Sequence, residues 1–375
     1  LDIIDVDGAA NFAADVTFAD GADIITASAG TSNTRVGVNA GNSITSGGNY
    51  NVVVGDEAGT ALTTGDSNVA VGFEALSTED ANGFVTAIGY QALKVLNAGA
   101  DSYNTAIGYT AGLAMTTGVQ NVLIGGLAGA SLTDADENVA VGIGALDADT
   151  LGSKSVAIGA SALSEQNFTT ATNPYNVGVG YFAGRNITTG TFNVLLGGLA
   201  GDALTDADYN IGVGYAALGA DTLGSRSTAV GHNALAQQNF TTATDAYNTA
   251  VGMLAGYSVT TADSNTLIGG LAGDALTVGG DNVAVGRDAL GADTKGSSSI
   301  AIGKNALAAQ NFTTATSAYN VAIGRSAGAA VTTGIQNTLV GGLAGTSLTD
   351  ADENVAVGIG ALDADTLGSK SVAIG

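Results

Sequence analysis

The sequence contains no cysteine and no tryptophan, and only one proline, Pro174, among 375 residues. Without cysteine the chain can form neither a disulfide bond nor a thiolate metal site. No apolar run reaches the ~18 residues that a membrane-spanning helix needs, so we expect no membrane insertion within this chain. Large side chains are scarce, whereas glycine occurs 57 times. This composition suits backbones that pack close together and argues against ordinary globular domains.

Basic residues are also few. Lysine and arginine together number 10 against 34 aspartates and glutamates, which gives a formal net charge of −24. Nucleic-acid phosphates and anionic lipid surfaces would both be repelled, so we expect neither as a partner. A basic leader segment is missing from the first residues, and the chain ends at Gly375 inside a repeat. We therefore expect the chain to be part of a longer protein.

A five-residue phrase of the type Asn-Val-Ala-Val-Gly, as at residues 68–72, recurs 20 times between residues 33 and 375. From residue 104 onward the copies are spaced by 17, 17, 17 and 21 residues, and this cycle makes a 72-residue super-repeat. The segment 131–159 recurs unchanged as 347–375. Repeats this short cannot bury enough surface alone, so they predict a stack of similar units.

Each repeat has the pattern of a short strand followed by turn residues, and 17 residues leave no room for a helix as well. The sequence thus predicts an all-β fold, a parallel β-solenoid of 20 coils over residues 33–375. At about 4.8 Å per coil, the rod would be about 95 Å long. Residues 1–32 lack the phrase but alternate like strands, and we expect them to form a separate β-rich lead-in segment.

The phrase has two faces, because successive strand side chains point in opposite directions. We expect Val69 and Val71 to face the core of the coil and to stack into ladders of valine and isoleucine. Asn68, Ala70 and Gly72 would form a face of small residues that lets another chain approach. The asparagines at the phrase starts would form a ladder along the stack.

The phrase resembles the repeats of two groups of fibrous proteins. Residues 155–159 and 371–375 read Ser-Val-Ala-Ile-Gly, the repeat found in the heads of trimeric autotransporter adhesins. Residues 104–112 resemble the shaft repeats of phage tail fibres, and residues 1–18 resemble the segments that precede those shafts. Either resemblance implies a homotrimer, and the resemblance to the adhesin heads implies left-handed coils. The long, uneven coils and the lead-in favour the phage fibre over the adhesin head.

The 21-residue coils carry insertions that are candidate sites for a surface ligand. Each contains a phenylalanine and a tyrosine whose rings could stack on a sugar. The alternative, which we favour, is that the phenylalanines plug the rod and the tyrosines form a ladder. The candidate ligand contacts are Phe168, Asn173, Tyr175, Phe240, Tyr247, Phe312 and Tyr319.

Acidic turns are candidate calcium sites, because calcium takes six to eight oxygen ligands. Clusters occur at Asp134/Asp136/Glu137, Asp147/Asp149, Asp206/Asp208 and Asp350/Asp352/Glu353. The usual calcium-binding signatures are missing, so we favour solvated turn residues and expect no cofactor.

Catalysis is disfavoured for a similar reason: every acidic pair is one copy of a series, and a rod of short coils offers no obvious cleft. His232, the only histidine, occupies a position that other coils fill with unrelated residues. We therefore expect no enzyme. The leading expectation is the shaft of a phage tail fibre on a virion, which presents a tip to a host glycan or protein. The alternatives are an extracellular adhesin head and, less favoured, a glycan-hydrolysing tailspike.

Overall fold

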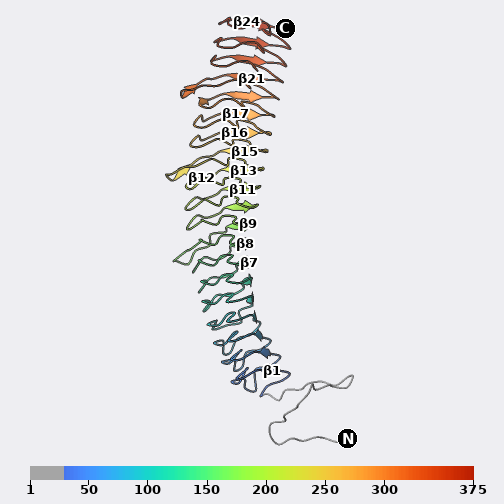
Figure 1. Cartoon of the computed structure of the whole chain (residues 1–375), viewed down its shortest axis with the longest axis vertical. Coiled ribbons are helices and arrows are strands. Elements are labelled where there is room, and N and C mark those ends of the chain that lie inside the picture. The colour runs from blue at the N-terminus through green and yellow to red at the C-terminus, as the bar shows by residue number, and fades with distance from the viewer. Residues whose placement is uncertain (1–28) are drawn as a thin grey trace, which may run out of the picture.

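The protein is an elongated stack of short coils (Figure 1). The structure, a computed structural model, describes residues 29–375. This part of the chain contains 24 strands and no helix, so no helix in it could cross a membrane. The prediction of an all-β parallel solenoid is confirmed, whereas the hand of the coil stays a prediction. The lead-in predicted for residues 1–32 lies outside the described residues, apart from bends at 29–32.

Twenty of the strands are the central three residues of the 20 predicted phrases, and together they form one sheet. Four further strands have two residues each; two lie in insertions, and each of these pairs with one of the other two in the preceding coil. The twenty are β1 (Thr34–Val36), β2 (Val52–Val54), β3 (Val69–Val71), β4 (Thr86–Ile88), β5 (Thr105–Ile107), β6 (Val122–Ile124), β7 (Val139–Val141), β8 (Val156–Ile158), β9 (Val177–Val179), β10 (Val194–Leu196), β11 (Ile211–Val213), β13 (Thr228–Val230), β15 (Thr249–Val251), β16 (Thr266–Ile268), β17 (Val283–Val285), β19 (Ile300–Ile302), β21 (Val321–Ile323), β22 (Thr338–Val340), β23 (Val355–Val357) and β24 (Val372–Ile374).

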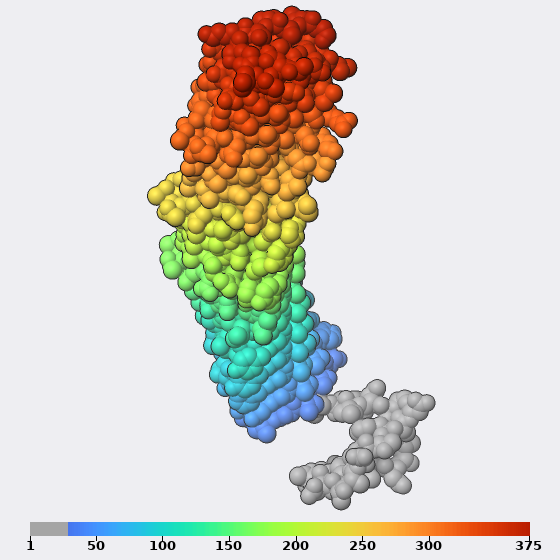
Figure 2. All heavy atoms as spheres, turned by 45° about the horizontal axis from the view of Figure 1, so that its top comes forward, coloured from blue at the N-terminus to red at the C-terminus, as the bar shows by residue number. Residues whose placement is uncertain are grey.

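Every long strand pairs in parallel with the strand of the next coil, residue opposite residue. In β2 and β3, for example, Val52, Val53 and Val54 lie opposite Val69, Ala70 and Val71. The same register continues to the last pair, β23 and β24. Figure 2 shows the result as a continuous column in which chain order follows the long axis. We call one strand level of this stack a rung.

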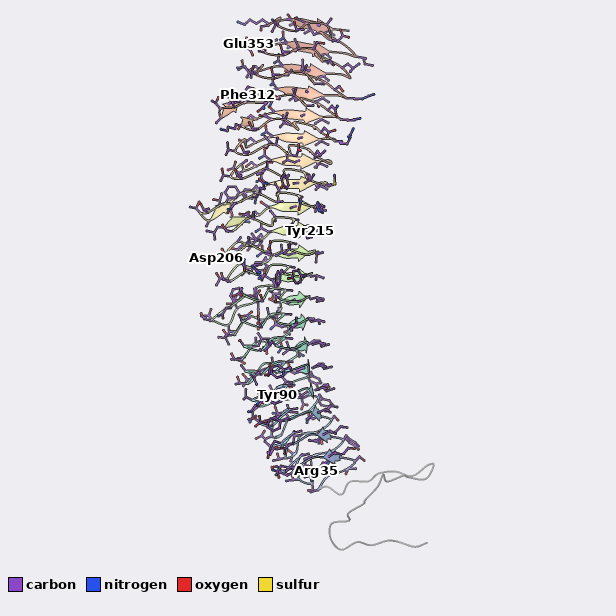
Figure 3. All side chains as sticks on the ribbon, in the orientation of Figure 1. Arg35, Tyr90, Asp206, Tyr215, Phe312 and Glu353 are labelled. Atoms are coloured by element: carbon purple, nitrogen blue, oxygen red, sulfur yellow. The ribbon has the colours of Figure 1, made fainter. Side chains whose placement is uncertain are left out.

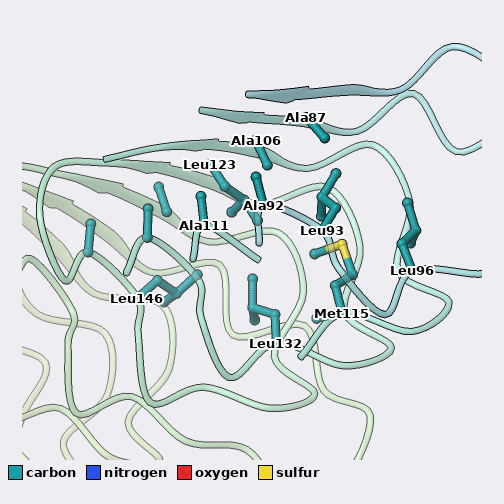
Figure 4. Packing of buried hydrophobic residues seen from close by; sticks show 14 of the residues in the cluster. Ala87, Ala92, Leu93, Leu96, Ala106, Ala111, Met115, Leu123, Leu132 and Leu146 are labelled. Carbon is teal, nitrogen blue, oxygen red and sulfur yellow. The ribbon is translucent and has the colours of Figure 1, made fainter. Parts of the chain in front are cut away.

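The strand faces are the reverse of the prediction. Ala70 is fully buried, whereas Val69 and Val71 beside it are only half-buried. Figure 4 shows the central strand side chains, such as Ala106, pointing into the coil toward Met115. The expectation of a valine and isoleucine core was therefore wrong, and so was the expectation that the small face meets another chain. The coil is too thin to hold β-branched side chains from every rung together with the leucines of its turns.

The asparagines that begin the phrases decide which face is inside. Asn121 donates its backbone N–H to the Oδ1 of Asn104 at 2.8 Å and its Nδ2 to the carbonyl of Ala135 at 2.7 Å. Its own Oδ1 accepts the backbone N–H of Asn138 at 2.9 Å. The predicted asparagine ladder is thus confirmed, and it runs inside the rod. Because strand side chains alternate, the residue two positions after each asparagine must also point inward.

Large and small residues compensate one another within this narrow core. Leu123 occupies the strand centre of β6, where most other rungs have alanine. In the same coil a Cβ at Gly129 would lie only 2.8 Å from side-chain atoms of both Leu123 and Leu132. The glycine is therefore required by its leucine neighbours. Buried alanines, leucines and their substitutes continue in this way from Ala40 to Ala361.

The glycine that closes each phrase is required by the backbone. Gly125 has φ +137°, and a Cβ there would meet the carbonyl oxygen of Gly142 in the next coil at 2.4 Å. The adjacent Gly126 has no such constraint, since its nearest neighbour would be 3.9 Å away. These two glycines form a matched pair for testing the stack.

We expect Gly125→Ala to lower the free energy of unfolding by roughly 3 kcal/mol or more, because it adds backbone strain to a clash with the next coil. Gly126→Ala should lower it by much less, because the added Cβ meets no atom of its own chain closer than 3.9 Å. Chemical denaturation followed by circular dichroism measures both. Equal effects of the two substitutions would contradict the rung-on-rung contact.

Candidate interaction surfaces

The outward residues of the strands form a continuous apolar surface, which we call the outer ladder. It comprises the first and third residues of the twenty long strands. The third is valine, isoleucine or leucine on every rung, and the first is valine, isoleucine or threonine. Ile107 and Ile268 within the rod are 36% and 39% exposed. Not one charged residue occurs among these positions, although the chain carries 44 charged side chains.

The size of the outer ladder sets it apart from scattered surface hydrophobics. Two side chains per rung, with rungs about 4.8 Å apart, present on the order of 30 Å² per rung and about 600 Å² along the rod. The largest apolar patch on an ordinary monomer is about 300–600 Å² and is often functional. An uncharged strip of this length on so acidic a chain is therefore a candidate interface.

Two columns of larger side chains border the outer ladder. The upstream edge consists of the residue before each phrase, and the downstream edge consists of the residue after each phrase-closing glycine. On the upstream edge Tyr175, Phe192 and Tyr209 stack from rung to rung with centroid distances of 5.6 and 5.0 Å. On the downstream edge Tyr90 and Tyr109 stack at 5.4 Å. Figure 3 shows Tyr215 of this edge beside the strand column.

The downstream edge also carries a short run of positive charge. Arg287, Lys304 and Arg325 lie on three successive rungs and are exposed. Arg287 pairs with the neighbouring Asp288 at 3.3 Å. The upstream edge of the same rung as Arg287 carries the exposed Asp281. Opposite charges thus stand at the two ends of this rung.

The insertions of the 21-residue coils lie on the opposite side of the coil, where Figure 3 labels Phe312, except for the tyrosine that ends each insertion on the upstream edge. They are pinned by short parallel pairs: β12 (Gly224–Ser225) with β14 (Thr244–Asp245), and β18 (Gly296–Ser297) with β20 (Thr316–Ser317). In the first insertion an isolated bridge joins Gly152 to Thr172 in the same way.

The seven candidate ligand contacts separate into two groups. Phe168, Phe240 and Phe312 are buried, with 5–6% exposure, as the plugging alternative predicted. They are closed to a surface ligand in this conformation. Asn173 is exposed, and so are the three tyrosines of the insertions, Tyr175, Tyr247 and Tyr319. Only Tyr175 among these tyrosines joins an aromatic stack, whereas Tyr247 lies beside the guanidinium of Arg226 at 5.8 Å.

Each insertion also supplies a buried glutamine that bridges a break in the asparagine ladder. At one rung of each super-repeat serine replaces asparagine, as at Ser155. Gln166 donates to Ser155 Oγ at 3.1 Å, and its Oε1 accepts from Asn176 Nδ2 on the next rung at 2.9 Å. The same glutamine donates to Asp149 Oδ2 at 2.6 Å. The other two insertions repeat this arrangement with Asp221 and Gln238 and with Asp293 and Gln310.

These aspartates are buried without a cationic partner. Asp221 Oδ1 accepts the backbone N–H groups of Gly224 and Phe240, both at 3.0 Å, which fixes the start of the insertion. Burial raises the pKa of Asp221 above its usual 3.8, and the hydrogen bonds from Gln238 and from the backbone only partly oppose this. Burial raises the pKa of Asp149 in the same way. This role was not predicted from the sequence, where Asp149 was grouped with the solvated acidic turns.

A raised pKa in the folded state makes stability fall as pH rises. The folded protein holds the Asp221 proton more tightly than the unfolded chain does, so stability is lost between pH 3.8 and the raised value. We expect Asp221→Asn to reduce the loss of stability between pH 4 and pH 7, because the substituted side chain has no proton to release. Denaturant titrations at the two pH values measure it.

The exposed Asp350 provides the control for this experiment, and Asp350→Asn should leave the pH dependence close to that of the parent chain. An unchanged pH dependence in Asp221→Asn would show that the buried carboxyl does not couple to folding.

The acidic turns mostly bond to the neighbouring coil. Asp136 accepts the backbone N–H of Val119 at 2.8 Å, and Asp352 does the same for Ile335. Within residues 29–375 there is no group of three or more acidic or histidine side chains placed to hold a metal ion. His232 is exposed on the downstream edge and stacks on Tyr215 at 5.5 Å.

Comparison of the chain with family models, with curated proteins and with solved structures gave no match.

Proposed function

We propose that the chain is the shaft of a homotrimeric fibre, of the kind that holds the attachment tip of a phage tail away from the virion. One observation carries this proposal: the outer ladder is uncharged and half-exposed on all twenty rungs. A rod that remains a single chain in water gains nothing from a valine, isoleucine or leucine at the third position of every long strand. Other copies of the same chain can cover the outer ladder, because a surface that repeats along the rod is matched by another surface with the same repeat.

The proposed trimer turns three outer ladders toward a common axis. Each strand then buries its apolar side against two partners, and the acidic turns face outward. Cyclic symmetry of this kind gives a closed particle rather than an open aggregate. The number three comes from the resemblance to trimeric fibres, whereas the identity of the buried face comes from the exposure of the outer ladder.

A shaft of this kind works by stiffness. The backbone hydrogen bonds of the twenty long strands run along the rod, and the asparagine ladder adds a second, buried set. The threonines of the turns add a third set, since Thr133 Oγ1 donates to the Thr150 carbonyl of the next coil at 3.1 Å. Bending the rod would stretch bonds of all three sets at once. The proposed role therefore needs no catalytic group.

Mass measurement by light scattering tests the assembly. We expect a particle of three times the 36.3 kDa chain mass. The variant Ile124→Asp/Ile268→Asp places two carboxylates in the buried axis, and it should be a folded monomer because both positions are solvated in the single chain.

The variant Thr170→Asp/Thr242→Asp adds the same charge to the exposed insertions and should remain trimeric. A parent chain that is monomeric at micromolar concentration would contradict the proposal, as would an Ile124→Asp/Ile268→Asp variant that stays trimeric.

The second candidate function is an adhesin head in which this segment itself binds a cell-surface glycan or protein. The observation that favours it is the exposure of Tyr175, Tyr247 and Tyr319, which lie at corresponding places in the three insertions. The proposed shaft predicts instead that the isolated chain does not bind cells and that the tip does so.

A triple substitution of these tyrosines by alanine separates the two functions. If the insertions bind a ligand, the parent chain should bind host cells in a flow-cytometry assay and the variant should lose at least about tenfold in affinity, since three stacking contacts are lost. The exposed pair Thr170→Ala/Thr242→Ala is the matched control. We expect no binding by the parent chain; binding that depends on the tyrosines would favour the adhesin.

A further inference from the structure

Four glycines on the downstream edge have no explanation within one chain. Gly126, Gly198, Gly270 and Gly342 occupy the same place in four successive super-repeats. A Cβ at any of them would find no atom closer than 3.8 Å, and none has a positive φ. Alanine would fit there and would restrict the unfolded chain. The space beside these glycines is therefore open to something outside the chain.

The upstream edge has side chains at the same rungs as these gaps. Phe192 stands on the rung of Gly198, between the rings of Tyr175 and Tyr209. Elsewhere the two edges carry rings on the same rung, as with Tyr103 and Tyr109. A large side chain on the upstream edge thus shares its rung with a glycine of the downstream edge at some rungs and with an aromatic ring at others. Either would let the upstream edge of one copy meet the downstream edge of the next.

Charges on the two edges are distributed so that like charges do not share a rung. The acidic Asp281 shares its rung with Arg287, and the ring of Tyr319 shares its rung with Arg325. Lys154 on the upstream edge shares its rung with the small Ala160. Along residues 29–375 no rung carries like charges on its two edges. Contact between edges at equal height therefore brings Asp281 to Arg287 and Arg325 to the ring of Tyr319. The other charged edge residues, such as Glu137 on the rung of Ile143, meet uncharged side chains, and no like charges meet.

We propose that the chains of the fibre are parallel and in register, with the downstream edge of each copy against the upstream edge of the next at the same rung. This inference rests on the proposed trimer, and it specifies which residues meet. When three outer ladders face one axis, their strands follow one another head to tail around it. The downstream edge of one chain therefore meets the upstream edge of the next. A closed ring leaves no axial offset, because any offset would accumulate into an open helix.

Engineered disulfides test the register directly, since the natural chain has no cysteine. The variant Asp281→Cys/Arg287→Cys places thiols on the two edges of one rung. With oxidised glutathione as the oxidant, we expect each chain to bond to the next, which gives a covalent trimer on non-reducing gels. Tyr319→Cys/Arg325→Cys should behave alike. The five extended residues between the paired positions keep the two thiols of one chain well beyond disulfide distance.

The control Asp281→Cys/Arg325→Cys uses the same edges two rungs apart, about 10 Å along the axis. It should form no covalent trimer, and neither should either single-cysteine variant. A covalent trimer from the offset pair in preference to the same-rung pairs would overturn the register.

The mass of the uncrosslinked variants separates this inference from the proposed function. Trimers by light scattering that fail to crosslink on the same rung would reject the edge contact and leave the shaft proposal standing. Monomers in the parent chain would reject both.

Discussion

The structure depends on the burial of an asparagine side chain in three of every four coils. An amide inside a thin, dry coil is costly unless each of its groups is paired, and this ladder pairs them with the backbone of the adjacent coils. Asn121 illustrates this, since its amide bonds to the Ala135 carbonyl and accepts from Asn138. Once the asparagine points inward, strand alternation sends the alanine inward and the β-branched residues outward. The hydrophobic surface of the rod is thus a consequence of a polar ladder.

Much of the fold could be predicted from the sequence, because the phrase and its spacing define each strand and its neighbour. All twenty long strands lie within the predicted phrases. The inside and outside of the strand could not be assigned in the same way. A rule that places the largest residues in the core misassigned Val69 and Val71, because that rule counts only transfer from water and ignores how little room a 17-residue coil has.

The candidate sites were predicted less well. The burial of Phe168 and its equivalents follows one of the two alternatives drawn from the sequence. The bridging role of Gln166 and Asp149 was not predicted: serine stands in place of asparagine at Ser155, but the sequence does not show which side chain bridges the break. The alternating residues of the outer ladder were recognised in the sequence but were predicted to face the core. With the faces corrected, the expected contact between chains moves from the small residues to the valines and isoleucines.

The central claim is that the outer ladder, half-exposed in one chain, is covered by other copies in the assembled protein. Hydroxyl-radical footprinting of the parent chain in solution measures this most directly. The account predicts that Leu196 and Ile268 of the outer ladder are protected, whereas Val278, which is 43% exposed in a turn outside the outer ladder and its two edges, is labelled. Labelling of the outer ladder at the rate expected from its exposure in a single chain would contradict the account.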